Sequence, residues 1–233
     1  IGSGLVGSEM CIRDRFIDVL GRPMICHVLD NLNMPDARFI LLTRKEHFEN
    51  EQETVNWIKS KYNVEFVLID NLTEGAACTV LHAHKLIDNN TPLLIANSDQ
   101  IVDMNIAEFI NDSENRNLDG SVLCFKDHDT KWSYAKIDGE GLITEIREKV
   151  VISEFATVGI YYFAKGGFFV KNAIDMIIRN ERVKNEFYVA PVYNFGIQEG
   201  LKFGIFNINI NQMHGIGTPT DLNVYIDLVQ RNK

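Results

Sequence analysis

The stretch RFILLTRKEHFENEQETVNWIKSKYNVEFVLID, residues 38–70, decides the fold class. Arg38–Thr43 contains a short continuous apolar run, as expected for a strand that is buried on both faces of a sheet. Glu46–Tyr62 has the mixed polarity of a surface helix, and Val64–Ile69 is again strand-like. A strand, a helix and a strand in this order predict a βαβ unit with parallel strands.

The alternation of helix-like and strand-like segments continues along the chain. Helices are predicted over Met24–Leu32, Gly75–Ile87, Ile106–Asp112, Phe168–Arg179 and Ala190–Glu199, with a last helix from Pro219. Further strands are predicted over Pro92–Asn97, Ser121–Phe125, Ser133–Ile137, Leu142–Arg147, Thr157–Phe163, Lys202–Phe206 and Ile208–Gln212. The pattern predicts an α/β fold, a single domain with a doubly wound mixed, mostly parallel sheet.

Charge and composition argue against several classes of partner. The formal net charge is −9 and the basic residues are scattered singly, whereas a nucleic-acid binder needs a basic face. No apolar run approaches the roughly 20 residues of a membrane helix, and no secretory signal is visible. The 4 cysteines lack CxxC spacing and the 6 histidines form no ligand pairs, which argues against a zinc site. We expect a cytoplasmic protein, and the sequence leaves a homo-oligomer open.

The N-terminus carries a glycine pattern that does not predict a dinucleotide site. IGSGLVG, residues 1–7, matches GxGxxG, but only Ile1 precedes the first glycine, so no strand leads into the motif. LVGSEMCIRDR, residues 5–15, resembles translated sequencing-adapter read-through. We therefore expect residues 1–15 to be non-native or disordered, and residues 16–233 to form the domain.

Two stretches that follow predicted strands carry candidate binding residues. ANSDQ, residues 96–100, places Asp99 at the carboxyl end of a strand, where ligands collect in open α/β sheets. A carboxylate there suits Mg²⁺, although Asp99 could equally cap the next turn. TEGAACTVL, residues 73–81, exposes backbone at Gly75 and Ala76 that a flat base could approach, although tight helix–sheet packing is the alternative.

A third constellation lies further along the chain. Glu148 and Lys149 end a predicted strand, and Gly159 lies inside the next one, ATVGIYYF (residues 156–163). A lysine at a strand end is commonly a solvated surface charge. A glycine among β-branched and aromatic residues is more informative, because it marks a place where a ligand or another backbone comes close.

Taken in order, these stretches resemble the nucleotidyltransferase family that makes nucleotide-activated sugars. The segments that carry the resemblance are GRPMICHVLDNL (21–32), TEGAACTVL (73–81), ANSDQ (96–100), KWSYAKID (131–138), EK (148–149), ATVGIYYF (156–163), NEFYVAPVYN (185–194) and GIGTPTDL (215–222). The resemblance implies a Rossmann-like nucleotidyltransferase fold. It also implies in-line attack by a substrate phosphate on the α-phosphorus of an NTP, with release of pyrophosphate.

The resemblance also implies roles for particular residues. Asp99 would hold Mg²⁺, and Lys149 would hold the phosphate of a phosphorylated sugar or alcohol. The remaining substrate-binding residues are Glu74, Gly75 and Ala76 at the base, and Tyr134, Ala135, Glu148 and Gly159 at the sugar.

Three departures from the family pattern limit this interpretation. The glycine-rich loop that cradles the triphosphate is absent, so we expect the 233-residue chain to be weakly active or inactive. Gly215 stands where many members have a second metal-binding aspartate, and Val150 replaces the proline after Lys149. Two alternatives stay open, a nucleotide-sugar-dependent glycosyltransferase and a non-catalytic nucleotide- or sugar-binding domain. The first would need a D-x-D pair, which residues 99–101 lack.

Overall fold

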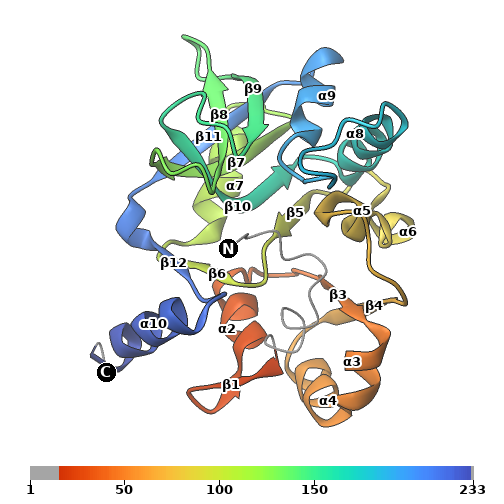
Figure 1. Ribbon diagram of the computed structural model, residues 1–233, viewed down its shortest axis with the longest axis vertical. Coiled ribbons are helices and arrows are strands. Elements are labelled where there is room, and N and C mark those ends of the chain that lie inside the picture. Colours follow the sequence, from red (N-terminus) through yellow and green to blue (C-terminus); the bar gives the residue numbers. More distant parts are fainter. Residues whose placement is uncertain (1–15, 232–233) are drawn as a thin grey trace. The chain divides into compact units, whose positions relative to one another are not determined.

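The computed structural model describes residues 16–231, which form two compact units (Figure 1). The described part of the first unit consists of residues 16–72, Ser98–Ile106 and 211–231. The second consists of Thr73–Asn97 and Ala107–Ile210. The expectation for residues 1–15 lies outside the described residues.

The first unit contains the βαβ segment that residues 38–70 predict. Its elements are β1 (Asp18–Val19), β2 (Arg22–Pro23), α2 (Met24–Asn31), β3 (Phe39–Arg44), α3 (Lys45–Asn50), α4 (Gln52–Lys61), β4 (Val64–Ile69), β6 (Gln100–Val102), β12 (Met213–Gly215) and α10 (Pro219–Arg231). Strands β3 and β4 pair in parallel from Phe39 opposite Val64, which confirms the βαβ prediction. β1 pairs with β2 and β6 pairs with β12, both antiparallel.

Two details of this unit differ from the prediction. β3 is half-buried along most of its length rather than buried on both faces, because β4 is its only strand partner among the described residues. The helix predicted over Glu46–Tyr62 is broken at Glu51, whose φ of −114° and ψ of 40° are not helical. Asn50 is a weak helix former, and Glu49 and Glu53 repel each other four residues apart, so the break falls where the helix is weakest.

The last helix begins as the sequence predicts. The backbone N–H of Asp221 donates to Thr218 Oγ1 over 3.2 Å, and Thr218 Oγ1 donates to Asp221 Oδ2 over 2.7 Å. Thr218 is therefore the N-cap and Pro219 the first helical residue, where the missing N–H of proline costs nothing.

The second unit is built on a six-stranded mixed sheet. Its elements are α5 (Ala76–Leu81), α6 (His84–Ile87), β5 (Leu93–Ala96), α7 (Ile106–Asn115, which begins at the unit boundary), β7 (Gly120–Lys126), β8 (Ser133–Ile137), β9 (Ile143–Glu148), β10 (Phe155–Phe163), α8 (Gly166–Ile178), α9 (Val192–Gln198) and β11 (Phe203–Ile208). The strand order is β11-β7-β10-β8-β9, and β5 also pairs with β10. The α/β prediction with a mixed sheet is confirmed.

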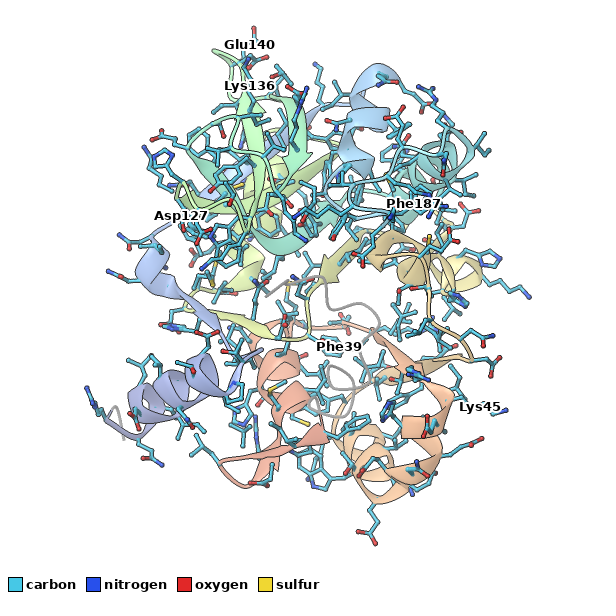
Figure 2. The ribbon with its side chains drawn as sticks, in the orientation of Figure 1. Phe39, Lys45, Asp127, Lys136, Glu140 and Phe187 are labelled. Carbon is cyan, nitrogen blue, oxygen red and sulfur yellow. The ribbon has the colours of Figure 1, made fainter. Side chains whose placement is uncertain are left out.

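Fewer strand pairs are parallel than the sequence predicts. In this sheet only β11 and β7 pair in parallel among the described residues, whereas β10 is antiparallel to β5, β7 and β8. Strands β8 and β9 form a hairpin, whose tip carries Lys136 and Glu140 (Figure 2). At the hairpin turn, Asp138 Oδ1 accepts the N–H groups of Glu140 and Leu142, each over 2.9 Å. Hairpin connections impose antiparallel pairing, and the alternation of helices and strands does not reveal them.

Two predicted boundaries are wrong for local reasons. The helix predicted over Gly75–Ile87 is split between α5 and α6, where the His84 ring hydrogen-bonds the Leu81 carbonyl over 3.0 Å. The strand predicted over Ile208–Gln212 is instead a short 3₁₀ helix, Ile210–Gln212. Ile208 is the last residue of β11 to find a partner on β7, so the chain beyond it has no strand to extend.

An aromatic cluster packs helices against this sheet. The Phe163 ring on β10 stacks on Tyr193 of α9 with centroids 4.5 Å apart, and Phe203 meets Tyr193 edge-on at 4.7 Å. The Tyr193 hydroxyl donates to main-chain carbonyls of the sheet, at Ser121 and Tyr162. Helices α8 and α9 lie beside each other in Figure 1. This rigid core holds β8, β9 and β10, on which most of the candidate substrate-binding residues lie.

Candidate active site

Asp99 lies in the first unit, beside a segment from the far end of the chain. Its carbonyl accepts the backbone N–H of Ile216 over 2.8 Å. The adjacent residue, Gln100, pairs with Gly215 across β6 and β12. The fold therefore brings together ANSDQ and GIGTPTDL, two of the stretches that carry the family resemblance.

A second glycine, Gly217, lies directly against the Asp99 carboxylate. A Cβ atom at Gly217 would lie 2.6 Å from Asp99 Oδ2, closer than any real contact. At Gly215 a Cβ atom would instead make ordinary contact with Asp221, at 3.8 Å from its Oδ2. Within residues 16–231, no three His, Cys, Asp or Glu side chains are grouped to hold a metal ion. Among the described residues, a cation on Asp99 would therefore draw its other ligands from water and substrate.

Gly75 lies in the second unit, where backbone packing requires a glycine. Its φ is +127°, and a Cβ atom there would lie 2.5 Å from both the N and the O of Phe187. The Phe187 N–H donates to the Glu74 carbonyl over 2.8 Å, and the Ala77 N–H donates to the Phe187 carbonyl over 2.9 Å. Figure 2 shows Phe187 beside α5. The close approach is to a loop residue rather than to the sheet, so it differs from the helix–sheet packing given as the alternative, and a base contact at Gly75 stays a prediction.

Gly75→Ala is expected to destabilise the protein by about 2–4 kcal/mol. The alanine would have to adopt an unfavourable positive φ, and its Cβ atom would clash with the backbone of Phe187. Gly139→Ala is the matched control, since a Cβ atom at Gly139 meets nothing within 4 Å. Urea unfolding followed by circular dichroism measures both variants. An equal stability of the two variants would contradict the close approach of Gly75 to Phe187.

The two neighbours of Gly75 are more accessible. Glu74 is exposed, and its carboxylate pairs with Arg182 over 2.6 Å. The Arg182 guanidinium lies over the Phe187 ring, 4.2 Å from the centroid. Ala76 is half-buried at the start of α5. The predicted base segment is thus held by the loop that precedes Tyr188.

Gly159 marks an irregularity in the central strand. Its φ is +95°, and the pairing of β10 with β7 shifts register between Thr157 and Tyr161. Its carbonyl accepts the backbone N–H of Asn97 over 3.0 Å. Glycine is needed here for a β-bulge, and a contact of Gly159 with a sugar stays a prediction.

Tyr134 and Ala135, predicted to pack beside a sugar, lie in the core of the sheet. Both have an exposed fraction of 0%. The Tyr134 hydroxyl donates to the Asp129 carbonyl over 2.8 Å, and burial raises the pKa of that hydroxyl to about 12. Their contact with a sugar stays a prediction, and in this structure both residues support β8.

Glu148 is a buried carboxylate at the end of β9. It is 7% exposed and lies opposite Ser133 in the β8–β9 ladder, where the Ser133 hydroxyl donates to its Oε2. Burial raises the pKa of the Glu148 carboxyl, and the nearby Glu186 adds to the effect, while Ser133 and the cations of Lys149 and Lys184 oppose it. A buried charge is retained only with such partners, so this position is a candidate for function.

The raised pKa of Glu148 predicts a pH dependence of stability. The folded protein holds this proton more tightly than the unfolded chain, whose pKa is near 4.5. The free energy of unfolding should therefore fall as the pH rises from that value through the folded pKa. Glu148→Gln should flatten this dependence at pH values above 4.5, measured by urea unfolding. Glu145→Gln, on the same strand, is the control and should retain the dependence.

Lys149 follows Glu148 in a left-handed backbone conformation, with φ 57°. This conformation is uncommon for a residue with a side chain, and the N–H of Lys149 stabilises it by donating to the Trp132 carbonyl over 3.0 Å. The Lys149 ammonium lies 4.0 Å from Glu148 Oε1 and donates to the Tyr188 hydroxyl over 3.0 Å. Its side chain is 11% exposed, so Lys149 is not a solvated surface charge, which is the common role of a lysine at a strand end.

Tyr188 is a residue that sequence reasoning quoted but did not assign. It belongs to NEFYVAPVYN, and nothing in that stretch alone shows that its hydroxyl meets Lys149. Ser133 was missed in the same way, because a serine in a strand carries no signal until the strand across from it is known. The second unit therefore brings Glu148, Lys149, Tyr188 and Ser133 together. The placement of Asp99 beside Lys149 in one cleft stays a prediction, because the two residues belong to different units.

Comparisons with known proteins agree with this fold. A family model described as nucleotidyl transferase matches residues 11–186. A search of curated protein sequences finds no significant match. Among solved structures, a nucleoside-diphosphate-sugar pyrophosphorylase from Vibrio cholerae has a TM-score of 0.76 at 20% identity, covering 92% of this chain and 91% of its own. None of the helices in residues 16–231 is long and apolar enough to cross a membrane.

Two further solved structures have the same fold. A protein described as a glucose-1-phosphate thymidylyltransferase, from Bacillus anthracis, has a TM-score of 0.68 at 19% identity, covering 94% of this chain and 87% of its own. A CMP:2-keto-3-deoxy-manno-octonic acid synthetase has a TM-score of 0.69 at 12% identity, covering 98% of this chain and 96% of its own. These identities support a shared fold only. The family model, however, matches well over half of the 233 residues, and the chain belongs to the nucleotidyl transferase family.

Proposed function

We propose that this protein transfers a nucleotidyl group from an NTP to a sugar phosphate, or to a similar phosphorylated alcohol, and releases pyrophosphate. The observation that carries the proposal is Lys149, a nearly buried cation held by Tyr188 beside the buried Glu148. Two of the proteins with this fold are described as a nucleoside-diphosphate-sugar pyrophosphorylase and a glucose-1-phosphate thymidylyltransferase. Both descriptions support a sugar phosphate as the acceptor.

The chemistry requires positioning more than proton transfer. An oxygen of the acceptor phosphate, already ionised at neutral pH, attacks the α-phosphorus of the NTP. The new P–O bond forms as the bond from the α-phosphorus to the bridging oxygen breaks, and the electron pair leaves with pyrophosphate. Lys149 would bind the acceptor phosphate, and Glu148 would accept a hydrogen bond from an acceptor hydroxyl. No general base is needed, and holding the two phosphates in line supplies much of the rate.

Asp99 is the residue that would hold Mg²⁺. One carboxylate, with waters and triphosphate oxygens, suits this small hard cation, and the glycine at 217 lets the GIGTPTDL segment lie directly against Asp99 Oδ2. When bound, the ion supplies charge neutralisation at the transferring group. We further propose that Glu74, Gly75 and Ala76 contact the base, and that Gly159, Tyr134 and Ala135 border the sugar.

Gly217→Ala tests the role of Asp99 without removing its charge. The added Cβ would lie 2.6 Å from Asp99 Oδ2, which is the end of a side chain that can rotate away. We therefore expect little loss of stability but a fall in kcat of about 10-fold or more, since misplacing a group by about 1 Å is costly. Gly215→Ala is the matched control, because its Cβ makes only ordinary contacts. Equal kcat values for the two variants would contradict this role.

The function is tested by pyrophosphate release. The four NTPs are combined with sugar 1-phosphates and phosphorylated alcohols, with and without Mg²⁺. The assay uses the 233-residue chain and a chain with a glycine-rich loop added ahead of Phe16. Release that needs an NTP, Mg²⁺ and a phosphorylated acceptor together is the expected result, strongest with the loop added. Binding of NTP or sugar phosphate without release would favour a non-catalytic domain, and glycosyl transfer from a nucleotide sugar would favour a glycosyltransferase.

A further inference from the structure

The hydroxyl of Tyr188 meets the ammonium of Lys149. It accepts a hydrogen bond from Lys149 Nζ over 3.0 Å, and burial and the nearby Glu186 carboxylate raise the pKa of the hydroxyl, so it stays protonated. The Lys149 ammonium also lies 4.8 Å from the centroid of the Tyr188 ring. Tyr188 thus holds Lys149 in two ways, through its hydroxyl and through the face of its ring.

This restraint matters because a lysine side chain is otherwise flexible. Its ammonium is a point charge on a four-carbon stem, and ordering that stem costs up to about 2 kcal/mol of rotamer entropy. Lys149 has three N–H donors, and Tyr188 takes one of them. Glu148 Oε1, at 4.0 Å, lies beyond hydrogen-bond distance, so among the described residues the other two donors remain for an anion.

The residue before Tyr188 fixes its position in the fold. Phe187 exchanges backbone hydrogen bonds with Glu74 and Ala77, on either side of Gly75, and leaves no room for a Cβ atom there. Two consecutive residues therefore join the predicted base segment to the predicted phosphate-binding lysine. Phe187 contacts the base segment and its neighbour Tyr188 contacts Lys149, so a single peptide bond links two parts of the candidate site that are distant in sequence.

We propose that Tyr188 is a positioning residue that holds the Lys149 ammonium in place for the phosphate of the acceptor, and that Phe187 anchors Tyr188 to the base segment. This inference rests on the proposed function, because it concerns how Lys149 binds phosphate. It goes further in assigning a role to a residue that makes no direct contact with the reacting groups.

Inorganic phosphate is the probe, so the test does not depend on the identity of the acceptor. The side-chain NMR signal of Lys149, identified by its loss in Lys149→Ala, is followed while phosphate is added to the 233-residue chain. Tyr188→Phe keeps the ring but removes the hydroxyl, and should weaken the phosphate response about 3- to 10-fold. Tyr188→Leu removes both contacts and should weaken it further. Tyr225→Phe, on α10, is the matched control and should leave the response unchanged.

A double-mutant cycle separates positioning from a general structural effect. Phosphate binding is read from the rise in the unfolding midpoint that it causes. If Tyr188 acts through Lys149, Tyr188→Phe should have no effect on phosphate binding in the Lys149→Ala background. If Tyr188→Phe weakens phosphate binding equally in wild type and in Lys149→Ala, the inference is wrong. This holds even if Lys149 of the wild-type protein binds phosphate.

The outcomes also distinguish this inference from the proposed function. If the Lys149 NMR signal of the wild-type protein does not change when phosphate is added, both the phosphate-binding role of Lys149 and the inference about Tyr188 are wrong. A wild-type signal that responds, together with an identical response in Tyr188→Phe, would overturn only the positioning role of Tyr188.

Discussion

Asp99→Asn is expected to lower kcat by about 100-fold or more, which is the size of effect seen when a group that stabilises developing transition-state charge is lost. The amide keeps the size of the side chain and the backbone bond from Ile216 to residue 99, so the fold should be preserved. The KM for the acceptor should change much less, because in our proposal Lys149 rather than Asp99 binds its phosphate. Initial rates of pyrophosphate release over a range of Mg²⁺ concentrations measure the effect.

Asp103→Asn is the control for this substitution. Asp103 belongs to the same unit and its carboxylate is hydrogen-bonded to the His214 ring over 2.7 Å, so the substitution removes a carboxylate charge from this unit. We expect its kcat to stay within about 3-fold of wild type, because our proposal gives Asp103 no part in binding the metal. If Asp99→Asn behaved like Asp103→Asn, the metal-binding role of Asp99 would be wrong.

The parts of the fold that could be predicted from the sequence are those fixed by local chemistry. The apolar runs of β3 and β4 flank a helical stretch. Two strands joined through a helix usually pair in parallel, as the structure shows. The turn at Asp138 and the cap at Thr218 were predictable for the same reason, because one side chain satisfies backbone groups two to four residues away.

The contacts that define the candidate site are not local, and this is why they could not be predicted. Position 75 requires glycine because φ is positive there and because the backbone of Phe187, far along the chain, occupies the space of a side chain. No pattern within TEGAACTVL contains that information. The same holds for the contact of Lys149 with Tyr188, which depends on where the loop after α8 returns to the sheet.

The exposed fraction of individual strand residues could not be predicted from the sequence either. Tyr134 and Ala135 are adjacent on β8, so their side chains point to opposite faces of the sheet, and a one-sided sheet would expose one of them. Both are instead 0% exposed, because this part of the sheet is covered on both faces. The family resemblance identified the strand, but only the packed structure shows how little of it is accessible.

Lys149→Ala is expected to raise the KM for the phosphorylated acceptor by about 10- to 100-fold, because a hydrogen bond from a charged group contributes about 1.5–3 kcal/mol. The ammonium would attract the acceptor phosphate in the ground state and in the transition state alike, so kcat should change much less than KM. The KM for the NTP should also stay close to wild type. Initial rates with each substrate varied in turn give the three constants.

Two further variants show whether the charge itself is responsible. Lys126→Ala removes an exposed lysine that pairs with Glu154, and it should leave all three constants within about 2-fold of wild type. Lys149→Ala leaves Glu148 buried without its neighbouring cation, which can destabilise the fold. The pair of substitutions Glu148→Gln and Lys149→Met removes both charges at similar volume, and should keep the stability while retaining the high KM. A normal acceptor KM in a folded Lys149 variant would show that this lysine does not bind the phosphate.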